Sequence, residues 1–253
     1  MLAATRKKRI KDLLTEKKSV TVSELSDKFN VTEETIRRDL NALHKEGALI
    51  RTHGGAFIQE GTLNEINYNL RETDHIENKR IIGKKCAQYV QNGDSIFLDS
   101  STTASFVAEA IRKKRITVLT DSLKIANMLS TENDIHLIVT GGEFSPRSNS
   151  FIGTGNLMSL NQYYVDSAFI SCRYVSMENH ITDSNDNLAL IRQKIIERSN
   201  KTFLIADYSK FDKTSFYHIC NFDCIYAIVT DKPLRPEWHS ELEKYNVIIN
   251  DVE

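Results

Sequence analysis

The first 58 residues carry apolar side chains at helical spacing in three successive segments. These side chains are Ile10, Leu13 and Leu14, then Val22, Leu25 and Phe29, and then Ile36, Leu40 and Leu43. Each set lies on one face of an α-helix. Thr21 and Thr32 precede the second and third sets, where a hydroxyl accepts a hydrogen bond from the first helical turn, and Glu24 completes a capping box with Thr21. The pattern predicts three short helices, the third running to about Glu46.

Two short apolar segments follow the third predicted helix, and a pair of glycines separates them. Gly47 suits the left-handed position that ends a helix. Residues 49–52 and 56–58 are typical of two short strands, and Gly54 and Gly55 favour a turn between them because glycine adopts positive φ without steric cost. A hairpin in this position is the wing of a winged helix-turn-helix fold. We therefore predict a winged helix-turn-helix domain over residues 1–58.

Apolar runs of strand length alternate with helical patterns from about Glu77 to the C-terminus. The strand candidates are Ser95–Asp99, Ile116–Thr120, Ile135–Thr140, Ser167–Ser171, Lys201–Ala206, Cys224–Val229 and Val247–Ile249. Nearly continuous apolar strands that alternate with helices are typical of a mostly parallel sheet covered by helices. We predict an α/β domain over residues 75–253, joined to the first domain by a polar linker over residues 59–74.

The composition is that of an ordinary globular protein. Of the 253 residues, 40% are hydrophobic and 26% are charged, which excludes disordered and low-complexity chains. The four cysteines are scattered and form no disulfide framework. No apolar run approaches the roughly 20 residues that span a bilayer, and the basic N-terminus lacks the apolar core of a signal peptide. These features predict a cytoplasmic protein with no membrane partner.

Charge is distributed unevenly between the two predicted domains. The net charge of −1 argues at first against a nucleic-acid partner. Residues 1–60, however, contain 12 Lys and Arg against 9 Asp and Glu, a net charge of +3, whereas the remaining residues contain 21 against 25, a net charge of −4. The net charge of the chain is the sum of a basic and an acidic domain, so it does not exclude a nucleic-acid partner.

The third predicted helix places polar side chains opposite its apolar face. Arg38 and Asn41 lie there, and in a major groove Arg bonds guanine and Asn bonds adenine. Glu33–Arg37 and Glu34–Arg38 are also i,i+4 pairs, so this face taken alone is better interpreted as a salt-bridged surface. The wing and the cations of the first helix favour DNA. The candidate DNA contacts are Arg6, Thr21, Thr32, Glu34, Thr35, Arg37, Arg38, Asn41, Arg51 and His53.

Hydroxyl and carboxylate residues, two glycines and a lysine follow four of the predicted strands at their carboxyl ends. They are Asp99, Ser100, Ser101, Thr102, Thr103, Asp121, Ser122, Gly141, Gly142, Asp207 and Lys210. Open α/β sheets bind ligands at this edge, and free N–H groups at helix N-termini favour an anion such as phosphate. Any one cluster is better interpreted as helix caps and turn residues, whereas four clusters at equivalent ends favour a ligand pocket.

Motifs at fixed spacing run through both halves of the chain. In the first half they are Arg6-x3-Ile10-x3-Leu14, then after seventeen residues Thr32-x2-Thr35-Ile36-Arg37-Arg38-Asp39-Leu40, and then Arg51-Thr52-His53-Gly54-Gly55-Ala56. In the second half they are Tyr68-x2-Arg71, Asp94-x-Ile96-Phe97-Leu98-Asp99-Ser100, Gly141-Gly142 with Pro146-Arg147-Ser148, and Asp207-x-Ser209-Lys210-Phe211. Together they resemble the DeoR-type bacterial transcriptional regulators.

The resemblance implies a sequence-specific regulator of transcription, a repressor of a carbohydrate-utilisation operon. It implies binding to double-stranded operator DNA as a homo-oligomer, a dimer or a tetramer. It further implies an effector domain similar to pentose-phosphate isomerases that binds a phosphorylated sugar or a related metabolite, and it adds Arg147 to the candidate effector contacts. No cofactor is expected.

The second half departs from the family pattern at several positions. Ser101 stands where the family usually has Gly, Asp121 where it has Asn, and Ser167 where it has Lys. The segment Ser171-Cys172-Arg173-Tyr174 replaces a Gly-Ala-Asp-Gly segment. A carboxylate at position 121 would repel a phosphate placed beside it. The departures therefore affect the expected identity of the effector.

Two other kinds of site were weighed on the residues. An alternative function is a sugar-phosphate isomerase-like enzyme, with Asp99, Asp121 or Asp207 as the base and Lys210 as its electrostatic partner. The N-terminal module argues against an enzyme because an isomerase does not need it. A metal site is not expected at His218, Cys220 and Cys224, because these residues fall on apolar strand patterns and lack a second ligand pair.

Overall fold

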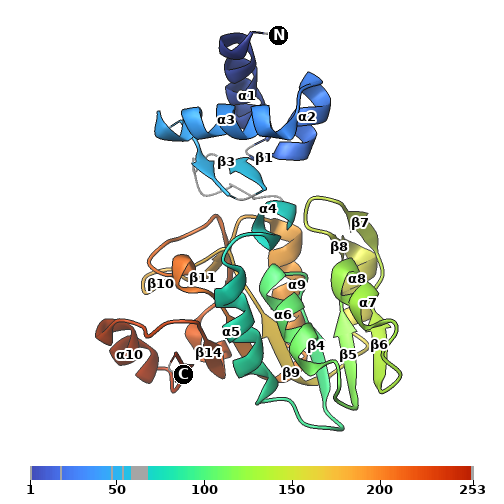
Figure 1. Ribbon diagram of the computed structural model, residues 1–253. Coiled ribbons are helices and arrows are strands. Elements are labelled where there is room, and N and C mark those ends of the chain that lie inside the picture. Colours follow the sequence, from blue (N-terminus) through green and yellow to red (C-terminus); the bar gives the residue numbers. More distant parts are fainter. Residues whose placement is uncertain (1, 18, 47, 53, 58–67, 252–253) are drawn as a thin grey trace. The chain divides into compact units, whose positions relative to one another are not determined.

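The computed structural model describes residues 2–17, 19–46, 48–52, 54–57 and 68–251, which form two compact units, Met1–Ile76 and Glu77–Glu253 (Figure 1). We call them the first unit and the second unit. Gly47, His53 and Ile58, which the sequence placed at a helix end and in the wing, lie outside the described residues. The predicted linker, 59–74, contains a helix, α4 (Tyr68–Glu72), which belongs to the first unit.

Helices α1 (Ala3–Lys17), α2 (Val22–Phe29) and α3 (Glu33–Lys45) surround the apolar core of the first unit. The three predicted apolar faces meet there in one buried cluster, with Phe29 half-buried at its margin. The Thr21 hydroxyl accepts a hydrogen bond from the Glu24 amide at 3.0 Å, and the Thr32 hydroxyl accepts one from the Thr35 amide at 3.4 Å. Both predicted helix caps are therefore confirmed.

The wing is present and contains one strand more than predicted. Strands β2 (Ile50–Arg51) and β3 (Gly55–Phe57) form the expected antiparallel pair. Strand β1 (Ser19–Thr21) pairs with the other side of β3, so the order is β1-β3-β2. The sequence missed β1 because three residues between two helices show no alternating pattern. Since β1 leads directly into α2, this ladder ties the wing to the helices.

A parallel sheet of seven strands runs through the described part of the second unit. In sheet order the strands are β15 (Ile248–Asn250), β14 (Ala227–Val229), β12 (Ser199–Ile205), β9 (Val165–Ile170), β4 (Ser95–Leu98), β5 (Ile116–Thr120) and β6 (Ile135–Val139). Each corresponds to a predicted strand. The largest shift is at β14, because the 3-10 turn η2 (Phe222–Cys224) occupies the residues before it. The predicted α/β architecture is confirmed.

Helices cover both faces of this sheet (Figure 1). On one face, α5 (Ile76–Ala87), α6 (Thr102–Ile111) and α7 (Leu123–Leu129) bury their apolar sides against alternate strand residues. On the other face, α8 (Thr154–Leu160) and α9 (Asp186–Ile196) pack on the strand residues between those. Helix α10 (Pro236–Glu243) buries Trp238 in a further cluster beside β12 and β14. The alternation of burial along each strand follows from the pleat.

Short antiparallel elements, which the sequence did not predict, extend the carboxyl end of the sheet. Strands β7 (Glu143–Ser145) and β8 (Ser150–Ile152) form a hairpin. Strands β10 (Tyr174–Ser176), β11 (His180–Asp183) and β13 (Tyr217–Cys220) form a small sheet, and η1 (Tyr208–Lys210) follows β12. Within the described ranges, no helix is long and apolar enough to cross a membrane.

Candidate functional site

The outer face of α3 presents the side chains that the sequence predicted for a major groove. Arg38 and Asn41 are exposed, and the Arg38 side chain keeps 80% of its surface accessible. Arg38 lies 3.6 Å from Glu34, and Arg37 lies 2.6 Å from Glu33. The i,i+4 pairs of the alternative interpretation are therefore formed in the free chain. Exposed pairs of this kind contribute only about 0.3–0.5 kcal/mol, so DNA can displace them.

The wing is joined to α3 at the same face. The Arg51 guanidinium donates a hydrogen bond to the Asn41 side-chain oxygen, and its other terminal nitrogen lies 3.4 Å from the Thr52 carbonyl oxygen. Two candidate DNA contacts, one from α3 and one from β2, are thus side by side. His53 belonged to the same set, but it lies outside the described residues.

Arg6 does not lie on this face, which corrects its inclusion among the DNA contacts. Its Nε is 2.5 Å from Asp39 Oδ2, and both residues are buried. Its guanidinium is held between α1 and α3 by this ion pair. Asp39, which the sequence analysis treated only as a motif residue, is therefore a structural partner of Arg6.

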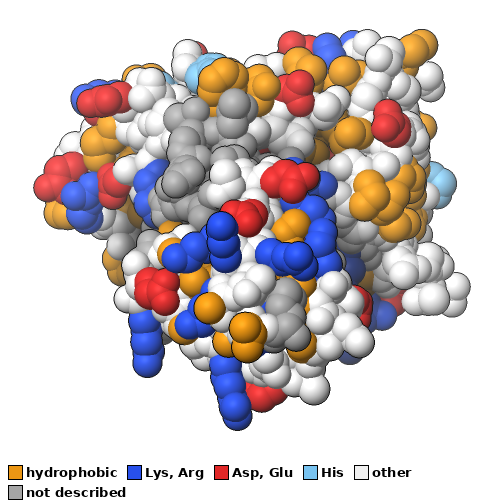
Figure 2. All heavy atoms as spheres, turned by 90° about the horizontal axis from the view of Figure 1, so that it is seen from above, with side chains coloured by type: hydrophobic (Ala, Val, Ile, Leu, Met, Phe, Trp, Pro, Cys, Tyr) orange, Lys and Arg blue, Asp and Glu red, His pale blue; other side chains and the backbone are white. Residues whose placement is uncertain are grey.

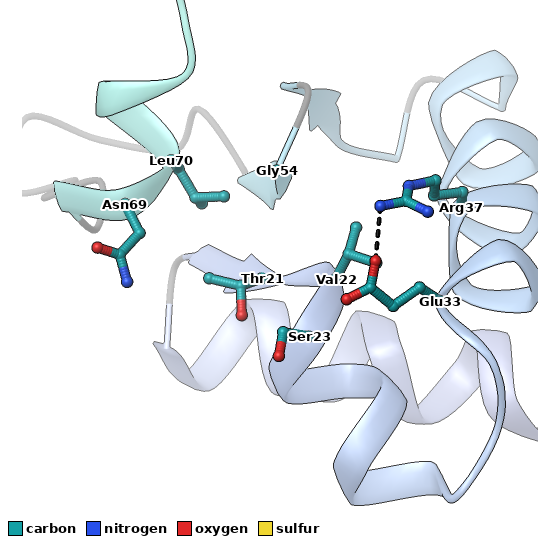
Figure 3. A pocket seen from close by; sticks show the side chains of 8 residues that line it. All are labelled: Thr21, Val22, Ser23, Glu33, Arg37, Gly54, Asn69 and Leu70. Atoms are coloured by element: carbon teal, nitrogen blue, oxygen red, sulfur yellow. Dashed lines mark hydrogen bonds and ion pairs between the residues drawn. The ribbon is translucent and has the colours of Figure 1, made fainter.

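A pocket of about 240 Å³ opens beside the N-terminus of α2 (Figure 3). Its lining is formed by Thr21, Val22, Ser23, Glu33, Arg37, Gly54, Asn69 and Leu70. The Val22 amide donates a hydrogen bond to the Gly54 carbonyl oxygen at 2.8 Å, whereas the exposed Ser23 lies at the positive end of the α2 dipole. Arg37 supplies a guanidinium on the opposite wall. Positive helix ends with a nearby guanidinium favour an anion such as a DNA phosphate.

Further cations are exposed on α1. Lys8, Arg9 and Lys11 face solvent, and Lys11 lies 3.2 Å from Glu46. Figure 2 shows a face of the molecule on which Lys and Arg side chains gather, with Asp and Glu side chains between them.

In the second unit, the predicted effector residues lie along one edge of the sheet. Strands β4, β5 and β6 are neighbours, so their carboxyl ends bring together Asp99–Ser101, Thr120–Ser122 and Thr140–Gly142. The Ser101 hydroxyl caps α6 through the Ala104 amide at 3.0 Å, and the Ser122 hydroxyl caps α7 through the Ile125 amide at 3.3 Å. The interpretation as helix caps therefore holds for these two serines. Thr102 and Thr103 are buried in the first turn of α6.

Asp99 is the centre of a buried ion network that the sequence did not reveal. Its Oδ2 accepts hydrogen bonds from the Ser171 amide at 2.8 Å and from Arg192 Nε at 2.9 Å. A terminal nitrogen of Arg192 donates to Asp183 Oδ2 at 2.6 Å. All these residues are buried, and the two carboxylates hold the pKa of Arg192 above its usual value although burial acts in the opposite direction. The network fixes α9 and β11 against the end of β4.

Asp121 lies next to this network but receives little compensation from it. Its side chain is 1% exposed, its Oδ2 accepts the Ser100 hydroxyl at 3.1 Å, and its Oδ1 has no hydrogen-bond partner in the part of the chain that the structure describes. Burial and, to a smaller extent, the charge of Asp99 raise the pKa of Asp121 to about 7, although Arg192 and the hydrogen bond from Ser100 act in the opposite direction. This carboxyl therefore changes its charge near neutral pH.

The remaining predicted effector residues lie at the ends of other strands. Asp207 is buried after β12 and accepts hydrogen bonds from the Ser209 amide and hydroxyl at 3.0 and 2.5 Å. Lys210 is half-buried in η1, and Arg147 is exposed in the turn between β7 and β8. Burial raises the pKa of Cys172 to about 12, and the nearby Lys210 opposes this. The ends of β9 and β12 therefore belong to the same polar region.

Two family models together match most of the chain. The model of the "DeoR-like helix-turn-helix domain" matches residues 6–62, and the model of the "DeoR C terminal sensor domain" matches residues 74–232. The chain belongs to the DeoR family of transcriptional regulators. The Arg38 face and the wing fall within the first match, and the strand ends from Asp99 to Lys210 fall within the second.

Curated members of the DeoR family are similar over nearly the whole length. The "uncharacterized HTH-type transcriptional regulator YulB" of Bacillus subtilis is 40% identical over 252 residues, which cover 100% of this chain and 98% of the relative. The regulator IolR of the same organism is 30% identical over 233 residues, 92% of each chain. A ribose 5-phosphate isomerase A from Neisseria gonorrhoeae aligns with 53% of this chain and 52% of its own at 20% identity, and its TM-score of 0.40 supports no conclusion.

Proposed function

We propose that this DeoR-family regulator binds double-stranded operator DNA with the outer face of α3 in the major groove and the wing on the adjacent backbone. One observation carries the proposal: Arg38 and Asn41 are exposed on α3, and Arg51 of the wing reaches the same face. In this arrangement Arg38 and Asn41 contact bases, and Thr32, Glu34, Thr35 and Arg51 flank them. The pocket with Thr21, Ser23 and Arg37 takes a backbone phosphate.

The test of this interface begins with a duplex that the wild-type protein selects from a random-sequence library. Arg38→Ala and Asn41→Ala each lose roughly tenfold or more in affinity for the selected duplex, because a bidentate base contact provides about 1–3 kcal/mol of discrimination. Arg80→Ala is a matched control, since Arg80 is an exposed arginine that pairs with Glu77 at 2.5 Å on α5. If both α3 variants bind as tightly as the control, the interface is misplaced.

We further propose that the protein represses a carbohydrate-utilisation operon. A small-molecule effector that controls it binds the second unit at the carboxyl ends of β4, β5, β6 and β12. The family match to a sensor domain and the open space beside Gly141, where a Cβ atom would meet nothing within 4 Å among the described residues, support a ligand at this edge. The proposed class is a phosphorylated sugar or a related metabolite, with Lys210 and Arg147 as its cations. A phosphate repels an ionised carboxylate, so the protonated form of Asp121 favours binding of a phosphorylated ligand.

A thermal-shift screen against phosphorylated sugars, repeated below and above pH 7, tests the effector class. A phosphorylated sugar that binds raises the melting temperature, and it does so more strongly below pH 7. Lys210→Ala reduces the shift, whereas Lys244→Ala, just after α10, where Lys244 pairs with Glu241, leaves it unchanged. A panel with no shift at either pH would exclude this class of effector.

The proposal does not include catalysis. The relatives that cover the chain are named as transcriptional regulators. We expect binding of a sugar phosphate without turnover. We also propose a homo-oligomer, a dimer or a tetramer, in the cytoplasm, because paired helix-turn-helix units read paired half-sites on DNA. Light scattering of the purified chain measures the mass of this assembly.

A further inference from the structure

Helix α4 packs on the wing although neither family match includes it. The matches end at residue 62 and resume at residue 74, and α4 occupies Tyr68–Glu72 between them. Tyr68 and Leu70 are 1% and 0% exposed. A Cβ atom at Gly55 would lie 2.7 Å from Leu70 Cδ2, and one at Gly54 would lie 3.6 Å from the same atom. The Leu70 side chain therefore rests directly on the Gly54–Gly55 turn of the wing.

The same turn is enclosed from its other side by β1. A Cβ atom at Gly55 would also lie 2.1 Å from the Val20 carbonyl oxygen and 2.9 Å from Thr21 Cα. A Cβ atom at Gly54 would lie 3.3 Å from the hydroxyl oxygen of Thr73, which follows α4. The wing turn thus lies between the β1 backbone and α4, with room for glycine alone at position 55.

Through this turn, α4 also reaches the proposed phosphate pocket. Gly54 accepts the Val22 amide at 2.8 Å, which links the wing to the first residue of α2. Asn69 and Leu70 form one wall of the pocket, and Ser23 and Arg37 form others (Figure 3). A displacement of α4 therefore changes the wing and the pocket together.

We propose that α4 is part of the DNA-reading unit and that Leu70 is a positioning residue, which holds the wing turn in place for contact with the DNA backbone. The proposal rests on DNA binding through α3 and the wing, as proposed above. Without the Leu70 side chain, the wing turn loses its apolar contact with α4 and keeps its contacts with β1 and Thr73. The wing then loses phosphate contacts, while α3, which is buried in a core cluster that does not include Leu70, keeps its base contacts.

The experiment compares the full-length wild type, Leu70→Ala, Leu70→Met and Leu14→Ala on the duplex that the wild type selects from a random-sequence library. Ethylation interference maps phosphate contacts, and methylation interference maps guanine contacts. Leu70→Ala lowers the affinity roughly threefold to tenfold and loses phosphate contacts beside the wing, with guanine contacts unchanged. Leu70→Met, which keeps the apolar volume, restores them. Leu14 is buried in the helical core, so Leu14→Ala weakens both kinds of contact together.

Two results overturn the proposal. One is an unchanged affinity and an unchanged phosphate map for Leu70→Ala. The other is a parallel loss of phosphate and guanine contacts, as in Leu14→Ala, which would mean that Leu70 only stabilises the fold. Failure of the underlying function is distinguishable, because the wild type would then select no duplex from the library.

Discussion

Arg6 and Asp39 form a buried ion pair across α1 and α3. We expect Arg6→Ala and Asp39→Ala each to lower the free energy of opening of the first unit by about 3 kcal/mol, because each removes one partner of a buried ion pair. The double variant loses less than the sum of the two. Hydrogen exchange of the α1 and α3 amides measures these energies.

Arg9→Ala, an exposed position on the same helix, serves as the control and changes this opening energy by less than about 0.5 kcal/mol. If Arg6→Ala instead weakened binding to DNA with no loss of exchange protection, Arg6 would be a contact residue after all, and the structural role of the pair would be refuted.

Asp121 makes the stability of the second unit depend on pH. Its pKa is raised from 3.8 to about 7 by burial and by Asp99, so its contribution to stability is present below pH 3.8 and is lost as the pH rises to about 7. Asp121→Asn removes this loss, and we expect it to be more stable than the wild type above pH 7 by at most about 4 kcal/mol. Thermal melting followed by Trp238 fluorescence, a signal from within this unit, measures the difference.

Asp166→Asn provides a control of opposite sign. Hydrogen bonds from the Ser95 hydroxyl and amide lower the pKa of Asp166, so its contribution is present above the unfolded value of 3.8 and is lost below it. This variant should be less stable than the wild type at neutral pH and should match it in acid. A variant at Asp121 that showed no pH-dependent gain would mean that the carboxyl is ionised without penalty.

Buried charges were the residues that the sequence described least well, although a signal was present. Arg6 precedes Ile10 by one helical turn, Asp39 falls between Ile36 and Leu43, and Arg192 follows Leu188 by one turn. Each therefore shares the apolar face of its helix. A charged side chain in that position needs a partner inside the protein. The partner itself comes from another element, and for that reason single-sequence patterns identified neither pair nor network.

At the scale of elements, the alternation of apolar runs with helical patterns separated what could be predicted from what could not. The seven strands of the parallel sheet were found because they are continuous apolar runs that alternate with helices. The antiparallel strands β1, β7, β8, β10 and β11 each have three or four residues, too few for a period to appear. Helix α4 has five residues and follows a polar stretch of sequence, so it was interpreted as part of the linker, although its Leu70 is fully buried.

The turn after β6 offers a test at this scale because the space beside its two adjacent glycines differs. Gly141 and Gly142 both have positive φ, at 69° and 110°. A Cβ at Gly142 would lie 2.5 Å from the Ile152 carbonyl oxygen of β8, whereas one at Gly141 would meet nothing within 4 Å among the described residues. We expect Gly142→Ala to destabilise the second unit by about 1–3 kcal/mol more than Gly141→Ala in urea unfolding. Equal losses would show that the β7–β8 hairpin moves away freely.

At the scale of the whole molecule, the near-zero net charge combines a first part of +3 with a second of −4. So small a positive charge gives a single helix-turn-helix unit little non-specific affinity, and affinity then depends on how many units bind one duplex. The fold class and the division into two functional parts were readable from sequence, whereas the number of chains that act together depends on surfaces that no local pattern describes.

The salt dependence of DNA binding measures how many helix-turn-helix units bind one duplex. Each phosphate neutralised by a cation contributes about −0.9 to the slope of log affinity against log salt concentration. If Arg37 holds a phosphate in the pocket at the α2 N-terminus, Arg37→Ala lowers the magnitude of the slope by about 1 for one bound unit and by about 2 for a dimer on two half-sites. Titrations of the selected duplex at several salt concentrations give the slope, with Arg80→Ala as the control that leaves it unchanged. A slope that Arg37→Ala does not alter would remove Arg37 from the DNA backbone, and the pocket would then need a different occupant.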